Sequence, residues 1–169
     1  MNKKLLSTLL LFSLFLNVLA GFSIYKLDKK KDEMTENFYE RSTNFVGNLK
    51  AAVASLESVT KDTDMEDNIS SMLTTYSSLV ASSSSSVFFD LSVQEKYGLN
   101  SHFSTTVGIY EQEMHDIYIK ALENRLTNED WERTKNIYEK MSILVQRLDI
   151  DSLIKANKKY LVETLSATS

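Results

Sequence analysis

Apolar residues dominate the first part of the chain, from Leu5 to Tyr25, and the polar residues among them are small. As a helix, this run would be roughly 32 Å long, enough to cross a hydrocarbon core of about 30 Å. Two lysines precede it, and Tyr25 and Lys26 end it with side chains suited to the membrane interface. The pattern predicts a transmembrane anchor over residues 1–25, whose representative positions are Leu5, Leu9, Phe12, Leu16, Leu19, Phe22 and Tyr25.

The same run also fits a secretory signal peptide that is cut after Ala20. Val18 and Ala20 are the aliphatic and small residues that signal peptidase tolerates before its cleavage point. The apolar run continues past this point through Phe22 and Ile24, which favours a retained anchor. A cleaved peptide remains the alternative.

An amphipathic pattern begins near Met34, after a charged juxtamembrane stretch over residues 26–33. Apolar residues then recur with the three- and four-residue spacing of one helix face. This seam consists of Phe38, Phe45, Leu49, Ala52, Leu56 and Val59. It can bind a partner or a second copy of the chain, or it can serve the chain's own core. The candidate partner residues are Phe38, Phe45, Leu49 and Leu56.

Five consecutive serines, Ser82 to Ser86, either form a flexible linker that divides the chain or continue a helix. Helical spacing passes straight through them, and the stretch holds no glycine or proline. Serine costs only about 0.5 kcal/mol against alanine inside a helix. We therefore expect one helix from about Asp64 to about Tyr97. Its expected core face is Met65, Ile69, Met72, Tyr76, Val80, Ser83, Val87 and Leu91.

Turn and capping signals divide the remainder into three more helices. Gly98 is expected just past the end of the serine-containing helix, and Thr127 or Asn128 is expected to cap a later one. The third helix should bury Val107, Tyr110, Met114, Ile117 and Ala121. The fourth should bury Trp131, Thr134, Tyr138, Met141, Val145 and Leu148. A short last helix, capped by Asp149 or Asp151, carries Leu153, Ile154, Tyr160, Leu161 and Leu165.

These elements predict an all-α fold: a membrane-tethered antiparallel helical bundle of four main helices plus a short C-terminal helix. The bundle domain is expected over residues 34–165, with a polar tail over residues 166–169. The absence of proline and the presence of only four glycines agree with long helices, because turns and sheets draw on both residues. The chain has no cysteine, which excludes disulfides and thiolate chemistry.

Charge is distributed unevenly along the chain. Six of the 19 basic residues precede Met34, but only three of the 23 acidic residues do. The part from Met34 onward therefore has 13 basic and 20 acidic residues, a formal charge of −7. Such a surface repels phosphate, so nucleic acid is not an expected partner.

Motifs for metal binding and catalysis are incomplete in this sequence. The acidic run after Lys61 resembles the start of a calcium loop, but Asp67 stands where glycine is needed and Leu73 where glutamate is needed. Thr63 and Glu66 instead predict a capping box for the second helix. Glu111 and His115 share a helix face, but a di-iron site would need a second such pair. We expect no enzyme activity, no metal and no cofactor.

The first functional hypothesis is a single-pass, membrane-anchored interaction or scaffold protein, with its helical domain outside the cytoplasm of a bacterial cell. Its partners would be membrane lipid, through the N-terminal helix, and a protein or a second copy of the chain. The lysine count on the two flanks favours the opposite orientation, but long domains cross membranes largely regardless of charge. A secreted helical protein cut after Ala20 is a further alternative.

The second hypothesis is ligand sensing. The expected layout resembles the extracytoplasmic four-helix sensory domains of bacterial chemoreceptors, in architecture and without a shared motif. That resemblance implies a bundle that binds a small molecule. The present sequence lacks the second membrane helix and the cytoplasmic output of such receptors, so a sensor of this kind would act through a partner.

Overall fold

The computed structural model describes residues 3–61 and 65–148, and for residues 3–11 and 65–68 it describes the backbone alone. The chain divides into two units, Met1–Asn37 and Phe38–Ser169. Within the described residues every regular element is a helix. The helices are α1 (Lys3–Lys61), α2 (Met65–Tyr97), α3 (Phe103–Leu122) and α4 (Asn128–Arg147).

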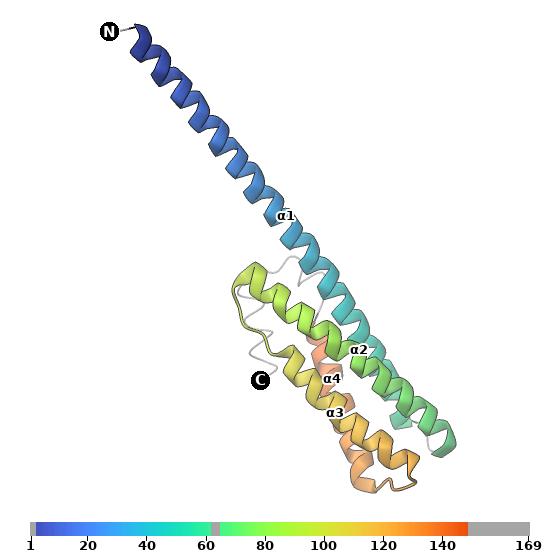
Figure 1. Ribbon diagram of the computed structural model, residues 1–169. Coiled ribbons are helices and arrows are strands. Elements are labelled where there is room, and N and C mark those ends of the chain that lie inside the picture. The colour runs from blue at the N-terminus through green and yellow to red at the C-terminus, as the bar shows by residue number, and fades with distance from the viewer. Residues whose placement is uncertain (1–2, 62–64, 149–169) are drawn as a thin grey trace. The chain divides into compact units, whose positions relative to one another are not determined.

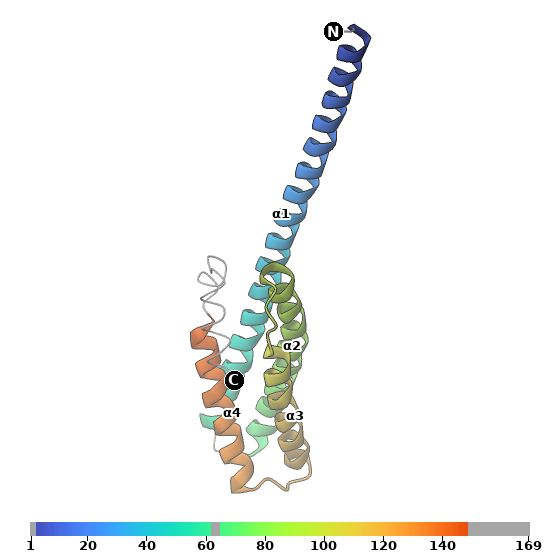
Figure 2. The same cartoon turned by 90° about the vertical axis from the view of Figure 1, so that its left-hand side faces the viewer.

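The second unit is an all-α bundle, which confirms the predicted fold class. From Phe38 onward, α1 and the three later helices run alternately in opposite directions (Figures 1 and 2). The first unit contains only the earlier part of α1 among the described residues. The predicted capping box at Thr63 and Glu66 and the predicted last helix beyond residue 148 lie outside the described side chains.

The five serines continue a helix, because α2 runs without a break from Met65 to Tyr97. The hydroxyls of Ser82, Ser85 and Ser86 donate to carbonyl oxygens within the helix itself. Ser82 Oγ donates to the carbonyl oxygen of Ser78 at 2.8 Å, and Ser86 Oγ donates to that of Ser83 at 2.6 Å. A serine satisfied in this way can be buried without an orphan polar group.

The predicted core face of α2 is correct at Met72, and Ile69 and Tyr76 pack against the core, but the prediction is wrong toward the end of the helix. Val87 and Leu91 were expected inside, but they are 47% and 46% exposed. The face that the core buries is rotated about the helix axis, and it consists of Met72, Thr75, Leu79, Ser82, Ser86, Phe89 and Val93. The large side chains of Leu79 and Phe89 fill the core on this face, and the serines between them are small enough to let neighbouring helices approach.

Four phenylalanine rings join α1, α2 and α3. Phe45 stacks on Phe89 with ring centroids 5.0 Å apart, and Phe89 meets Phe103 edge-on at 5.4 Å. Phe38 completes the group at 6.1 Å from Phe89. All four are at most 2% exposed, so this cluster anchors three helices by burial and ring geometry together.

The core faces of α3 and α4 follow the predicted spacing closely. Val107, Met114, Ile117 and Ala121 are buried in α3, as are Thr134, Met141 and Leu148 toward the end of the chain. The predicted aromatic positions Tyr110, Trp131 and Tyr138 are only partly buried and pack against the rim of the core, as does Val145. Ile137 and Leu144 take the central positions of α4 instead.

The turns between helices use the expected chemistry. Gly98 follows α2 with a φ of 64°, and its N–H donates to the carbonyl oxygen of Gln94 at 2.9 Å. This left-handed cap suits glycine, which has no Cβ to clash. Asn124 has a φ of 53° after α3, where the N–H of Arg125 donates to the carbonyl oxygen of Lys120 at 2.8 Å. That bond closes the final turn of α3 in a Schellman motif.

The two faces of the serine run give a direct test of this packing. Replacing the buried Ser86 by aspartate should lower the free energy of unfolding by about 3 kcal/mol, because a carboxylate would enter the core without a partner. Ser84→Asp, on the exposed side two residues earlier, should change it by less than about 0.5 kcal/mol. Urea unfolding of the full chain in mild detergent, followed by circular dichroism, measures both. Equal losses would contradict the burial of Ser86.

Candidate interaction surface

The outward face shared by α1 and α2 is almost free of charge. No charged residue occurs in α2 from residue 68 to residue 89, and Lys50 is the only one in α1 from residue 42 to residue 56. In contrast, α4 has eight charged residues among its 20. The charges of the bundle are therefore concentrated away from the α1–α2 face.

A furrow runs along this face between the two helices. One recess of about 310 Å³ is lined by Ala54, Ser55, Ser58, Ser70, Ser71 and Thr74. A second recess of about 430 Å³ is lined by Asn48, Ala51, Leu73, Thr74, Ser77, Ser78 and Ala81. Because Thr74 lines both, the two recesses are neighbours along one furrow. Its walls are small side chains and hydroxyls, so a partner could come close to both helix backbones.

Large apolar side chains are exposed on α2, where Leu73 lines the furrow and Phe88 and Leu91 lie beyond Ala81, the last α2 residue of its lining. Leu73, Phe88 and Leu91 are 46%, 56% and 46% exposed. Phe88 lies seven residues, or two turns, after Ala81 and therefore shares its helix face. Exposed apolar groups that gather on one face commonly mark an interaction site.

Polar contacts join the two helices and bound this face. The side-chain amide of Asn48 donates to the carbonyl oxygen of Ala81 at 3.3 Å and to Ser85 Oγ at 3.2 Å. At one end Arg41 pairs with Glu95 at 3.3 Å, joining α1 to α2. Lys61 pairs with Glu57 at the other end, and this pair raises the pKa of the lysine. We define the neutral face as the exposed α1–α2 surface between these two ion pairs.

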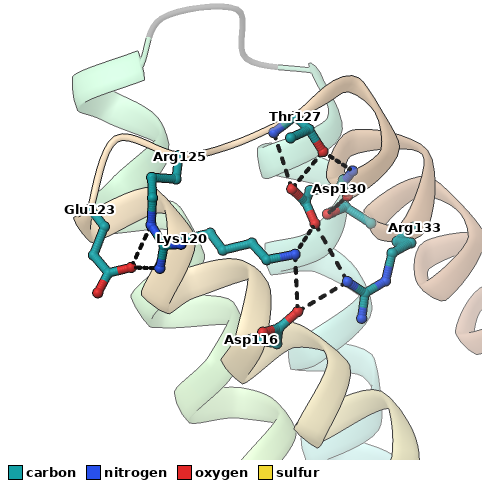
Figure 3. Close-up of polar contacts among 8 residues, drawn as sticks. Asp116, Lys120, Glu123, Arg125, Thr127, Asp130 and Arg133 are labelled. Carbon is teal, nitrogen blue, oxygen red and sulfur yellow. Dashed lines mark hydrogen bonds and ion pairs between the residues drawn. The ribbon is translucent and has the colours of Figure 1, made fainter.

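A polar cluster closes the α3–α4 turn on another part of the bundle (Figure 3). Thr127 caps α4, and its backbone N–H and hydroxyl both donate to Asp130 Oδ2, at 3.0 and 2.7 Å. Lys120 reaches across from α3 and donates to Asp130 Oδ1 at 2.8 Å. Arg133 bridges Asp130 and Asp116, at 3.4 and 3.1 Å. The capping box thereby becomes the centre of a clasp between two helices.

Asp130 is the most perturbed acid in this cluster. Burial alone would raise the pKa of its carboxyl, but hydrogen bonds from Lys120 and Thr127 outweigh burial and lower the pKa to about 2. Asp116 also has a lowered pKa, because it accepts hydrogen bonds from Arg133 and Lys120. With two acids matched by two bases, the cluster has its charges satisfied internally. Its chemistry suits a structural clasp better than a proton-transfer site.

A second aspartate fixes the α2–α3 turn. Asp90 Oδ1 accepts from Ser101 Oγ at 2.5 Å, and Asp90 Oδ2 accepts from the backbone N–H of Ser104 at 2.9 Å. A carboxylate at the amino end of α3 is favourable because the helix dipole is positive there. Asp90 thus supplies the cap that His102, at the N-cap position, does not provide through its own side chain.

Of the two roles left open for the α1 seam, a partner contact or the chain's own core, burial supports the core. Phe38, Phe45, Leu49 and Leu56 are at most 1% exposed. Their apolar atoms already contact the chain's own helices, so they offer nothing to a second protein. The neutral face was missed by the sequence reasoning, although the 22-residue stretch of α2 without a charge was a visible signal for it.

The histidines do not join a metal-binding cluster. Among the described residues, no group of three or more histidine, cysteine or carboxylate side chains could hold a metal ion. His115 is exposed on α3, and its ring lies 5.0 Å from that of Tyr76 on α2. The acids after Lys61 that resemble the start of a calcium loop lie outside the described side chains.

The predicted membrane segment is helical where it is described. Leu5 and Leu9 are among the residues whose side chains lie outside the description, while Phe12, Leu16, Leu19, Phe22 and Tyr25 are 46–65% exposed on α1. Over the residues with described structure, none of the helices has the length and apolar character needed to cross a membrane.

Comparison with protein-family models, with curated proteins and with solved structures finds no match to this chain.

The clasp at Asp130 should make the free energy of unfolding depend on pH. Because its pKa is lowered in the folded state, its contribution is complete above the unfolded pKa of about 4 and is lost as the pH falls toward about 2. Asp130→Asn should therefore lower the free energy of unfolding by about 2 kcal/mol at pH 7 and by much less at pH 2. Urea unfolding across this pH range measures the difference. If the difference between the free energies of unfolding of wild type and Asp130→Asn stays constant with pH, the clasp is contradicted. Glu132→Gln, at an exposed position of α4, is the matched control.

Proposed function

We propose that this chain is a single-pass, membrane-anchored interaction protein whose helical bundle, outside the cytoplasm, binds a protein partner through the neutral face. The observation that carries the proposal is a furrow together with exposed Leu73, Phe88 and Leu91 on a face where Lys50 is the only charged residue of α1 between residues 42 and 56 and α2 has none from residue 68 to residue 89. Interface cores are depleted in charged residues and enriched in aromatic ones. The neutral face has this composition, and its ion-paired ends correspond to a polar rim.

The anchor is supported by the N-terminal unit. Large apolar side chains are exposed all around α1 in its described part before the lysines, and they are Phe12, Leu14, Phe15, Leu16, Val18, Leu19, Phe22, Ile24 and Tyr25. A helix that is apolar on every side needs a nonpolar environment around it. Lys26 Nζ lies 4.7 Å from the ring centre of Phe22, an aromatic–cation pair that suits the edge of a bilayer. Membrane lipid is therefore the proposed partner of this unit.

Binding is favoured over catalysis by the chemistry of the neutral face. Its furrow presents hydroxyls, one amide and small apolar groups, none of which titrates near neutral pH. The most perturbed carboxyl, that of Asp130, is committed to the α3–α4 clasp. An interaction protein needs only shape and burial, which this face supplies.

Ligand sensing is the second candidate, and the size of the recesses favours it. Volumes of about 310 and 430 Å³ fall at the lower end of the range of small-molecule sites. Hydroxyl linings would suit an uncharged polar ligand. A thermal-shift screen of the full chain against small metabolites separates this candidate: a ligand that raises the melting temperature, and loses that effect in Thr74→Leu, supports sensing.

Site-specific photo-crosslinking tests the proposed interface. A benzophenone side chain at Ala81, on the neutral face, should give a protein adduct in intact cells, because the partner covers that position. The same group at Gln112, exposed on α3, should give none. Equal adducts at both positions, or none at Ala81, would contradict the proposed surface.

Orientation is tested at Gln112, the exposed control position on α3. Since the chain has no cysteine, Gln112→Cys introduces a single thiol. A membrane-impermeant maleimide should label it in cells whose outer barriers have been removed, and the labelled form should keep residues 1–20. Labelling only after lysis reverses the orientation, and a form in the medium that begins at Gly21 supports the secreted alternative.

A further inference from the structure

We infer that the partner on the neutral face is a second copy of the same chain, an inference that rests on the proposed interaction function. The argument begins with charge. The chain from Met34 onward has a formal charge of −7, so two copies repel each other over most of their surfaces. The neutral face brings the fewest like charges together, because Lys50 is the only charged residue of α1 between residues 42 and 56 and α2 has none from residue 68 to residue 89.

Self-association also requires that one surface complement itself. A two-fold symmetric dimer brings the same patch of each copy together. The neutral face offers both kinds of surface that such a contact needs. It has a furrow lined mostly by small residues and by the exposed Leu73, and the exposed Phe88 lies two turns beyond the furrow on α2. In a two-fold symmetric dimer, apolar side chains on the neutral face of each copy can pack into the furrow of the other copy.

The size of the neutral face fits a weak dimer. Between Arg41 and Glu57, α1 advances about 24 Å, and two packed helices present a face about 20 Å wide. The footprint is therefore about 500 Å² per copy, or about 1,000 Å² in total, at the lower limit of specific interfaces. Two anchored copies would share one membrane, which raises their effective concentration.

Sedimentation equilibrium of the full chain in density-matched detergent tests the inference. Wild type should show a concentration-dependent monomer–dimer equilibrium. Ala81→Glu should weaken it at least tenfold, because each copy then brings a negative charge into the contact. Gln112→Glu adds the same charge away from the neutral face and should leave the equilibrium unchanged. Circular dichroism checks that the variants remain folded, as expected for exposed helical positions.

A charge exchange supplies the more specific measurement. Ala81→Lys alone should also weaken the dimer, and an equimolar mixture of Ala81→Glu with Ala81→Lys should recover association. Recovery supports contact between the two neutral faces, since a merely structural effect of either variant would persist in the mixture. Failure to recover, or dimerisation of Ala81→Glu as strong as that of wild type, would overturn the inference.

The outcomes separate this inference from the proposed function. If wild type stays monomeric at all concentrations while the benzophenone at Ala81 captures a different protein, the second copy is wrong as the partner and the interaction function stands. If wild type is monomeric and Ala81 captures nothing, both fail. An adduct at Ala81 with twice the mass of the chain, together with charge-exchange recovery, supports both.

Discussion

The hydrogen bond from a serine or threonine hydroxyl to a carbonyl one turn earlier is the interaction on which this bundle depends. Ser42, Ser82, Ser86, Ser92 and Thr134 are all buried, and each donates in this way within its own helix. Without that internal partner, each buried hydroxyl would cost about 1–3 kcal/mol. With it, a small polar residue occupies a helix contact almost as alanine would, and the helices approach closely.

The same choice of small residues shapes the outside of α1 and α2. Serine and alanine on the outward side leave a furrow, and the absence of charge along α2 leaves that furrow neutral. Charged residues are instead used at the α3–α4 turn, where Asp130 joins Thr127, Lys120 and Arg133. The bundle therefore separates two tasks: ion pairs fix the turn between α3 and α4, and a smooth face remains on α1 and α2.

Sequence periodicity predicted the number and order of the described helices, and it placed the seam of α1 on one face. It failed on the core face of α2, because Val80, Val87 and Leu91 have helical spacing as regular as that of Leu79, Ser86 and Phe89. Hydrophobicity ranks Val80, Val87 and Leu91 above the set that contains Ser86. The hydrogen bond of the Ser86 hydroxyl within the helix, however, removes most of the free-energy cost of burying it. The cap at Thr127 was predictable from local sequence. The contact of Lys120 with Asp130 depends on how α3 packs against α4, which no local pattern contains.

The aspartate clasps have a consequence for the order in which the bundle assembles. Asp90 reaches Ser101 and Ser104 over 11 and 14 residues, and Lys120 reaches Asp130 over 10. Two hydrogen bonds from α1 to α2 span more of the chain, 37 residues from Asn48 to Ser85 and 54 from Arg41 to Glu95. Short loops lose less chain entropy on closing and form sooner. The bonds at the α2–α3 and α3–α4 turns are thus expected to form before the bonds that join Arg41 and Asn48 of α1 to α2.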